Sequence, residues 1–290
     1  MKKIFFISLL FFSTFLFSQE KEKDSIAKDS LVKKSNWKVN GQFTFLFNQS
    51  TFTNWKAGGD NTIAGNFGIN YDFNYKKGNW NWDNRIITVY GLSNVKDEGF
   101  RKTSDRFEYN SLLGKKTKKD WFLSFFLNFK TQYSRGYDYK PAQRIAISDF
   151  FSPAYLSFGP GMLWKKSDNA TINIAPATAR FTFVSDEFSG KYGVEPGKNT
   201  KIAVGFSLSA YFKFKIFEDV TMQHIFALYS NYLQRVQNVD VDYQLRFSVP
   251  VNKYLSMDIL LHTLIDDNAS SKVQFKEIFG LSVKYTFHRK

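Results

Sequence analysis

The sequence of 290 residues has no cysteine, 6 prolines and 3 histidines. The absence of cysteine excludes disulfides, thiolate chemistry and the acylated cysteine that anchors a lipoprotein. No apolar run of about 18 residues follows the first 18 positions, which excludes a membrane protein built from helices. The sequence also lacks metal-ligand spacings, a phosphate-binding glycine loop and a nucleophile elbow. We therefore expect no catalytic residue, no metal and no cofactor, and we predict that the chain is not an enzyme.

The first 18 residues have the pattern of an export signal. Lys2 and Lys3 precede an apolar stretch at 4–17 that is too short to span a bilayer. We expect cleavage after Ser18. Residues 19–36 are mostly charged and polar, and this composition predicts a flexible periplasmic lead-in.

The composition combines many aromatic residues with a low mean hydropathy. Aromatics make up 19% of the chain, phenylalanine alone accounts for 33 residues, and the mean hydropathy is −0.34. This balance is typical of a membrane barrel, in which only one side of each strand is apolar. The alternative is a soluble all-β sandwich or barrel, in which aromatics at alternating positions on nearly every strand would be unusual.

An apolar residue recurs at every second position from about residue 38 onward. The run Phe67, Ile69, Tyr71, Phe73 is interleaved with Gly68, Asn70, Asp72 and Asn74. A period of two predicts strands with one apolar face and one polar face. The fold class predicted for 37–290 is therefore all-β: a transmembrane antiparallel up-and-down barrel of about 12 strands in the outer membrane of a Gram-negative bacterium. The expected strands are 37–48, 62–76, 80–92, 103–115, 120–134, 154–166, 169–183, 199–216, 219–233, 238–250, 253–265 and 277–288.

The connectors between these strands alternate in length. Those at 77–79, 116–119, 167–168, 217–218 and 251–252 are short, and most of the others are long, with 234–237 as the exception. Outer-membrane barrels have short periplasmic turns and longer external loops. The alternation therefore orients the predicted barrel.

The polar face of the strands supplies candidate residues for the lumen. Two interpretations of these charges stay open: a water-filled pore that favours anionic solutes, or ion pairs that hold a narrow interior closed. Apolar residues on the same face, including Phe122, Phe126 and Leu163, favour the packed interior. The lumen-lining candidates are Arg85, Arg106, Lys130, Arg180, Lys213, Arg246, Asp72, Glu108 and Asp242.

A formal charge of +14 raises the question of partners. Many of the basic residues fall in the predicted turns, where anionic lipid headgroups or solvent would meet them, and an exported chain has little access to nucleic acid. We expect membrane lipids and other outer-membrane proteins as partners, and no nucleic acid. His262, near Asp266 and Asp267, is the one histidine with acidic neighbours in the sequence, and we interpret it as a solvated residue at the rim.

Two predicted external loops have distinctive sequences. In the first, Gly58 and Gly59 permit a sharp reversal, and Trp55 is costly to leave in water. A hairpin turn and a ligand contact are both open for this loop, whose candidate residues are Asn54, Trp55, Gly58, Gly59 and Asp60. The third loop contains Ile145, Ile147, Phe150 and Phe151. These apolar residues predict that it folds inward as a constriction or packs on a partner.

Three runs carry a family resemblance: N-W-x-x-G-G at Asn54–Gly59, R-K-T-x-D at Arg101–Asp105 and F-F-S-P-A-Y at Phe150–Tyr155. They resemble an uncharacterised outer-membrane β-barrel family of the Bacteroidetes, known only as a domain of unknown function. The resemblance implies a barrel in the outer membrane and no particular activity. The function we expect is a small-solute channel or transporter; the alternative is a non-enzymatic structural or accessory subunit of an outer-membrane protein complex.

Overall fold

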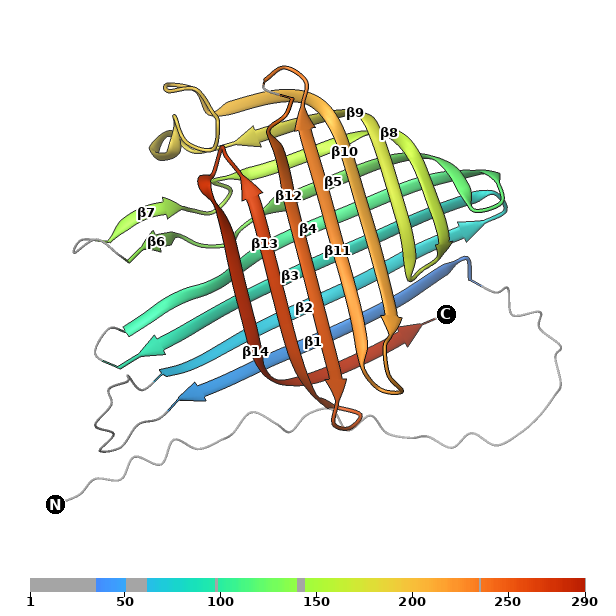
Figure 1. The fold of residues 1–290 in the computed structure, drawn as a ribbon, viewed down its shortest axis with the longest axis horizontal. Helices are drawn as coiled ribbons and strands as arrows, with labels where there is room; N and C mark the ends of the chain where they lie inside the picture. The colour runs from blue at the N-terminus through green and yellow to red at the C-terminus, as the bar shows by residue number, and fades with distance from the viewer. Residues whose placement is uncertain (1–34, 51–61, 97–98, 140–143, 235, 290) are drawn as a thin grey trace, which may run out of the picture. The chain divides into compact units, whose positions relative to one another are not determined.

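Twelve antiparallel strands form a closed barrel in the computed structural model, which describes residues 35–50, 62–96, 99–139, 144–234 and 236–289 (Figure 1). The predicted fold class is confirmed: each strand pairs with the next barrel strand in the sequence. No helix of the described residues is long and apolar enough to cross a membrane. The barrel strands are β1 (Trp37–Ser50), β2 (Thr62–Lys77), β3 (Trp80–Val95), β4 (Gly99–Lys118), β5 (Trp121–Thr131), β8 (Ala154–Ser167), β9 (Ala170–Phe183), β10 (Thr200–Lys215), β11 (Thr221–Asn231), β12 (Val239–Pro250), β13 (Leu255–Asp266) and β14 (Ser270–Arg289).

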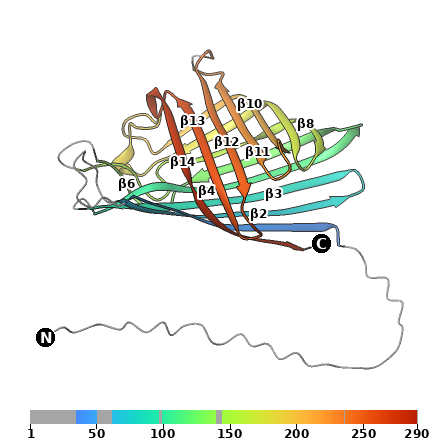
Figure 2. The same ribbon diagram turned by 60° about the horizontal axis from the view of Figure 1, so that its bottom comes forward.

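Pairing between the first and last strands closes the barrel. The register of β1 on β14 runs without a break from Val39 opposite Arg289 to Phe47 opposite Leu281. In Figure 2, β14 bends so that its last part runs along β1. Each barrel strand is thus paired on both sides over part of its length; β14 pairs with β13 from Ser270 to Val283 and with β1 from Leu281 to Arg289.

The strand bounds differ from the predictions mainly at the long strands. β14 begins at Ser270, not at 277, so most of the expected external loop 266–276 belongs to the strand. β4 likewise extends to Gly99–Lys118. In β14 the charged Glu277 interrupts the outward apolar series of Val273, Phe275 and Phe279, although the pairing with β13 continues to Asp266 opposite Ser270. The predicted alternation of connector lengths is confirmed only in part: 51–61, 132–153, 184–199 and 232–238 are longer than the turns at the other end, whereas 96–98 and 267–269 are short.

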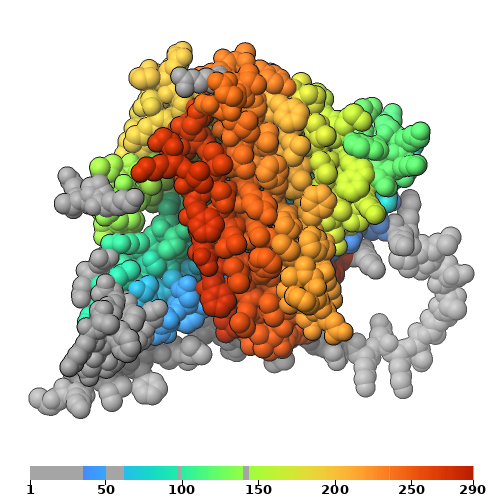
Figure 3. Space-filling model, viewed as in Figure 1, coloured from blue at the N-terminus to red at the C-terminus, as the bar shows by residue number. Residues whose placement is uncertain are grey.

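The outward face of the wall is apolar. Large side chains on this face stay open to the surroundings, among them Leu123 (58% exposed), Ile202 (60%) and Phe279 (54%). The space-filling view shows the side chains of β12, β13 and β14 covering one side of the barrel as a continuous wall (Figure 3). A soluble monomer rarely exposes an apolar surface of this extent.

The buried residues of the wall are instead largely polar and face the interior. They include Glu108, Asn173, Gln244, Asp258 and Ser282. The cluster of buried apolar side chains lies away from the wall, in the connector between β9 and β10, where Val184, Phe188 and Val194 pack together. The barrel is therefore apolar outside and polar inside, as the period-two pattern predicts.

A small hairpin stands between β5 and β8, formed by β6 (Gly136–Asp138) and β7 (Ile145–Ser148). Ala146 packs against the Val184 cluster, while Ile145 (52% exposed), Ile147 (45%) and Phe150 (64%) stay exposed. The prediction that this loop folds inward is therefore wrong for these side chains. Alternation along β7 turns Ala146 to the cluster and the two isoleucines away from it.

Pro176 marks an irregularity in β9. Between the pairs Ser207–Ala175 and Gly205–Thr178, β9 has two residues, 176 and 177, whereas β10 has one, 206. The proline therefore lies at a bulge, where its lack of an N–H to donate to the ladder is tolerated. The Thr178 hydroxyl donates to the carbonyl oxygen of Ala175 at 3.0 Å, and the Tyr232 hydroxyl donates to that of Pro176 at 2.9 Å.

Opposite this bulge, β8 carries Gly159 and Gly161, where a β-carbon would overlap the carbonyl oxygens of Ala177 and Ile174. We expect Gly161→Ala to force the strands apart and to lower the free energy of unfolding by about 1–3 kcal/mol. Urea titration followed by tryptophan fluorescence measures the change. Gly68→Ala is the matched control, since its β-carbon would lie 3.7 Å from the nearest atom, the Thr88 carbonyl oxygen. Equal stabilities of the two variants would contradict this account.

Candidate functional site

The barrel interior gathers the charged side chains of the polar face. Contacts between strands that are not neighbours in the wall show which way these side chains point: Lys130 of β5 reaches Asp242 of β12, and Arg180 of β9 reaches Asp240 of β12. Such contacts run through the interior. By strand register, all of the lumen-lining candidates lie on this inner face: Arg85, Arg106, Lys130, Arg180, Lys213, Arg246, Asp72, Glu108 and Asp242.

Asp242 is the centre of an ion-pair network in the middle of the barrel. Its carboxylate lies 3.1 Å from Lys130 Nζ and 3.8 Å from an Arg106 guanidinium nitrogen. His262 Nε2 lies 2.9 Å from the other carboxylate oxygen. These groups come from β4, β5, β12 and β13, so the network connects opposite parts of the wall.

Glu108 extends the network toward β4 and β5. Its carboxylate pairs with Arg106, whose Nε donates at 2.7 Å. It also accepts hydrogen bonds from Asn110 at 2.9 Å and from Asn128 at 3.0 Å. A buried carboxylate needs this number of donors to offset the loss of its hydration.

His262 lies elsewhere than the sequence analysis expected. Its imidazole faces the interior and contacts Asp242, so its interpretation as a solvated rim residue beside Asp266 and Asp267 is wrong. The two acidic residues lie at the loop end of β13, whereas Asp242 comes from the neighbouring strand β12. Proximity along the chain was a poor guide, because the four residues from His262 to Asp266 span about 13 Å of strand, whereas Asp242 lies diagonally opposite His262 on the adjacent strand.

Below the network, toward the short turns, lies a layer with more cations than anions. Arg85 pairs with Asp72 at 2.5 Å, and its guanidinium lies 4.8 Å from the centre of the Tyr211 ring. Lys213 and Arg246 also face the interior in this layer. Within the described residues, neither makes a side-chain hydrogen bond or an ion pair.

The turn end of the interior carries further ion pairs. Lys38 of β1 and Lys165 of β8 each lie 3.1 Å from the carboxylate of Asp168, in the turn between β8 and β9. Burial opposes ionisation of Asp168, but the two lysines outweigh it and lower the pKa of this carboxyl. The ionised carboxylate therefore connects β1 to strands that are not its neighbours.

The opposite end, where the longer connectors lie, contains a polar cavity of about 410 Å³. Arg180 spans it, pairing with Asp240 at 2.5 Å and stacking its guanidinium 3.5 Å from the centre of the Tyr229 ring. Gln234 and Asp267 are exposed members of the lining, so the cavity reaches the surface. Its remaining lining residues include Tyr155, Thr182, Tyr192, Lys201, Asn231, Asn238, Asp266 and Asn268.

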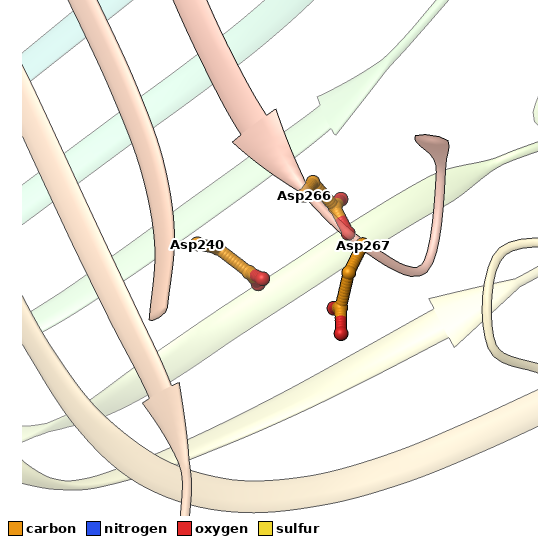
Figure 4. Close-up of side chains that lie close together, drawn as sticks. All are labelled: Asp240, Asp266 and Asp267. Atoms are coloured by element: carbon orange, nitrogen blue, oxygen red, sulfur yellow. The ribbon is translucent and has the colours of Figure 1, made fainter. Parts of the chain in front are cut away.

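Three carboxylates meet in this cavity, from Asp240, Asp266 and Asp267 (Figure 4). An oxygen of each lies within 4.8 Å of the others. Each also has a partner of its own: Asp240 pairs with Arg180, Asp266 accepts from the backbone N–H of Asn268 at 3.0 Å, and Asp267 accepts from Asn238. This grouping is not evident from the sequence, because Asp240 is separated from the other two along the chain and only the strand register brings them together.

Tyr192 comes to the cavity from the connector between β9 and β10. Burial raises the pKa of the Tyr192 phenol, so the group stays neutral at physiological pH. Its hydroxyl donates to the carbonyl oxygen of Ile147 in β7. The small hairpin is thus tied to the wall of the cavity. The first-loop candidates Asn54, Trp55, Gly58, Gly59 and Asp60 lie outside the described residues.

Comparison with sequence families gives a partial match. The family described as a protein of unknown function (DUF3078) matches residues 47–137, which is less than half of the chain. The matched range contains the Asn54–Gly59 and Arg101–Asp105 runs but not Phe150–Tyr155. No curated protein matches the sequence.

Among solved structures, the chain is similar to several outer-membrane barrels. The COG4313 outer membrane channel from Pseudomonas putida F1 is 6% identical with a TM-score of 0.41, and the alignment covers 92% of this chain and 100% of that one. The translocator domain of the autotransporter NalP from Neisseria meningitidis is 7% identical with a TM-score of 0.35, over 87% and 89% of the two chains. The outer membrane channel DcaP of Acinetobacter baumannii is 8% identical with a TM-score of 0.28, over 87% and 96%. Similarity at this level carries no argument about the activity of this chain.

The contact between Lys130 and Asp242 can be tested by a double-mutant cycle. We expect Lys130→Met to lower the free energy of unfolding by about 1–3 kcal/mol, because the partner carboxylate loses its nearest cation. The double variant Lys130→Met/Asp242→Asn should lose less free energy of unfolding than the two single variants lose in sum. The difference, which is the coupling free energy of the pair, should be about 0.5–3 kcal/mol. The exposed pair Lys198–Glu195 is the control and should couple more weakly. Additive effects at the inner pair would contradict the network.

Proposed function

We propose that this chain is an outer-membrane channel that admits small polar solutes at its loop end and passes them through a narrow, charged lumen. The observation that carries the proposal is the distribution of side chains on the barrel wall, which is the reverse of that in a soluble protein. Apolar side chains lie outside and ion-paired side chains lie inside. Such a wall suits a lipid environment outside and a hydrated one inside. The proposal includes no catalytic step.

The outward face supports a position in a Gram-negative outer membrane. Exposed apolar side chains occur on strands around the barrel, such as Phe45 on β1, Leu123 on β5 and Ile202 on β10. Near the short turns, Trp80, Trp121 and Tyr254 are exposed as well. Aromatic residues of this kind belong at the boundary between lipid tails and water. Together with the predicted export signal, this makes membrane lipids the proposed partners.

The inner face supports passage of small solutes only. The Asp242 network brings side chains of opposite walls within ion-pair distance, which narrows the middle of the lumen. Its members keep some exposure, 28% for the Lys130 side chain and 23% for that of Arg106. Solvent therefore reaches the network, and the cavity at the loop end provides an entrance.

Planar-bilayer recordings test the proposal. We expect the purified protein to give a small conductance, and the double variant Lys130→Ala/Asp242→Ala to give a larger one, because two side chains that narrow the lumen are shortened. Lys115→Ala is the control, since Lys115 lies outside the lumen, 5.6 Å from the centre of the Trp80 ring. A folded protein that conducts in neither form would overturn the channel.

A second candidate function, an accessory subunit of an outer-membrane complex, is favoured by exposed apolar residues: Ile145 and Ile147 of the small hairpin, and Phe150 just after it. If a partner covers them, Ile147→Ser/Phe150→Ser should release the chain from a larger particle in mild detergent without unfolding the barrel. Ile63→Ser, on the outward face of β2, is the control. A wild-type protein that migrates alone on native gels would count against this second function.

A further inference from the structure

We propose that Arg85, Lys213 and Arg246 form a binding site for a small oxyanion inside the barrel, below the Asp242 network. The inference rests on the proposed channel in naming the class of solute. It depends on three observations: the register of the wall, a contact across the lumen and a local excess of positive charge.

The register places two of the cations in one row of the inner face. Lys213 on β10 is opposite Gln223 on β11, and Gln223 is opposite Arg246 on β12. Neighbouring strands are about 4.8 Å apart, so the two cationic residues begin about 10 Å apart with an amide side chain between them. Long flexible side chains at this spacing can converge on one small ligand.

The side chain of Arg85 reaches these two cations from the opposite side of the barrel. It belongs to β3, yet its guanidinium lies 4.8 Å from the centre of the Tyr211 ring on β10. Tyr211 precedes Lys213 by two residues and therefore shares its face of the strand. The guanidinium of Arg85 thus lies beside the Lys213 row, and the three cations face a common space.

The charges of this layer do not balance. Asp72 pairs with Arg85 at 2.5 Å. One carboxylate thus faces the three cations of the proposed site, and the net charge of the four groups is +2. The nearby carboxylate of Asp258 attracts Arg246 electrostatically, but its ion pair is with Lys284 at 2.6 Å, and this second pair leaves the excess unchanged. In the network above, by contrast, Arg106 and Lys130 each have a carboxylate partner. Arg246 is half-buried and Lys213 is exposed, so a solute in the lumen can reach both.

The hydrogen-bond donors of these three side chains determine the chemical class of the ligand. Two planar guanidinium groups and one ammonium match the oxygens of a phosphate or a carboxylate, and guanidinium can bind such a group through two parallel hydrogen bonds. A half-buried cation without a partner is costly, and an oxyanion would relieve this cost. The sign of the charge excludes a metal ion as the ligand of this layer.

Titration calorimetry of the folded protein in detergent tests the site without requiring conduction. Inorganic phosphate is the probe, and acetate tests for a carboxylate ligand. We expect wild-type protein to bind at least one of the two, and Lys213→Gln/Arg246→Gln to weaken that binding at least tenfold. Lys115→Gln, which removes a lysine outside the lumen, should bind as wild type does.

The outcomes separate this site from the channel itself. If wild-type protein binds neither anion, or if the double variant binds as tightly as wild type, the site is overturned even where the barrel conducts. If the anion binds and the variants weaken it, the site stands even where no current is seen. Lys213→Gln alone, at an exposed side chain, gives the same test if the double variant does not fold, with a smaller but measurable loss of affinity expected.

Discussion

The pairing of β1 with β14 is the constraint on which the rest of the structure depends. A backbone N–H or C=O that faces lipid without a partner costs several kcal/mol, so a sheet with an apolar exterior has to close on itself. The register from Val39 to Phe47 against β14 closes the sheet over the length that it covers. Closure in turn separates the outside of the barrel from its interior. Each side chain of a wall strand faces one of these two environments and has to match its polarity.

The ion pairs of the interior follow from that separation. Charged residues on the inner face cannot reach the bulk solvent freely, and they find counter-ions on other strands. Asp242 shows this most fully, because its partners come from β4, β5 and β13. Such contacts hold strands that share no backbone hydrogen bonds, so the barrel is stabilised across its lumen as well as around its wall.

The period of two in the sequence predicts the fold, because it shows which side chains face outward and which face inward. The site depends on distances between side chains of different strands, and the period does not predict these. A period of two assigns Asp242 and Lys130 to the inner face from the sequence alone. Their contact, however, requires the order and register of strands that are far apart in the chain. The same limit explains why His262 was expected beside Asp266 and Asp267, and why the carboxylate of Asp240 was not placed with theirs. The hairpin β6–β7 was missed because strands of 3 and 4 residues are too short to show a period.

The lumen is layered, and the layers differ in how their charges are satisfied. At the loop end and in the middle, cations such as Arg180 and Lys130 are neutralised by carboxylates of the wall. Below them, Lys213 and Arg246 make no side-chain hydrogen bond or ion pair among the described residues, and cations of this kind are stable there where water or a solute solvates them. A wall evolved solely to fill its interior would have no need of this excess. This layer therefore argues for a hydrated interior beneath the network.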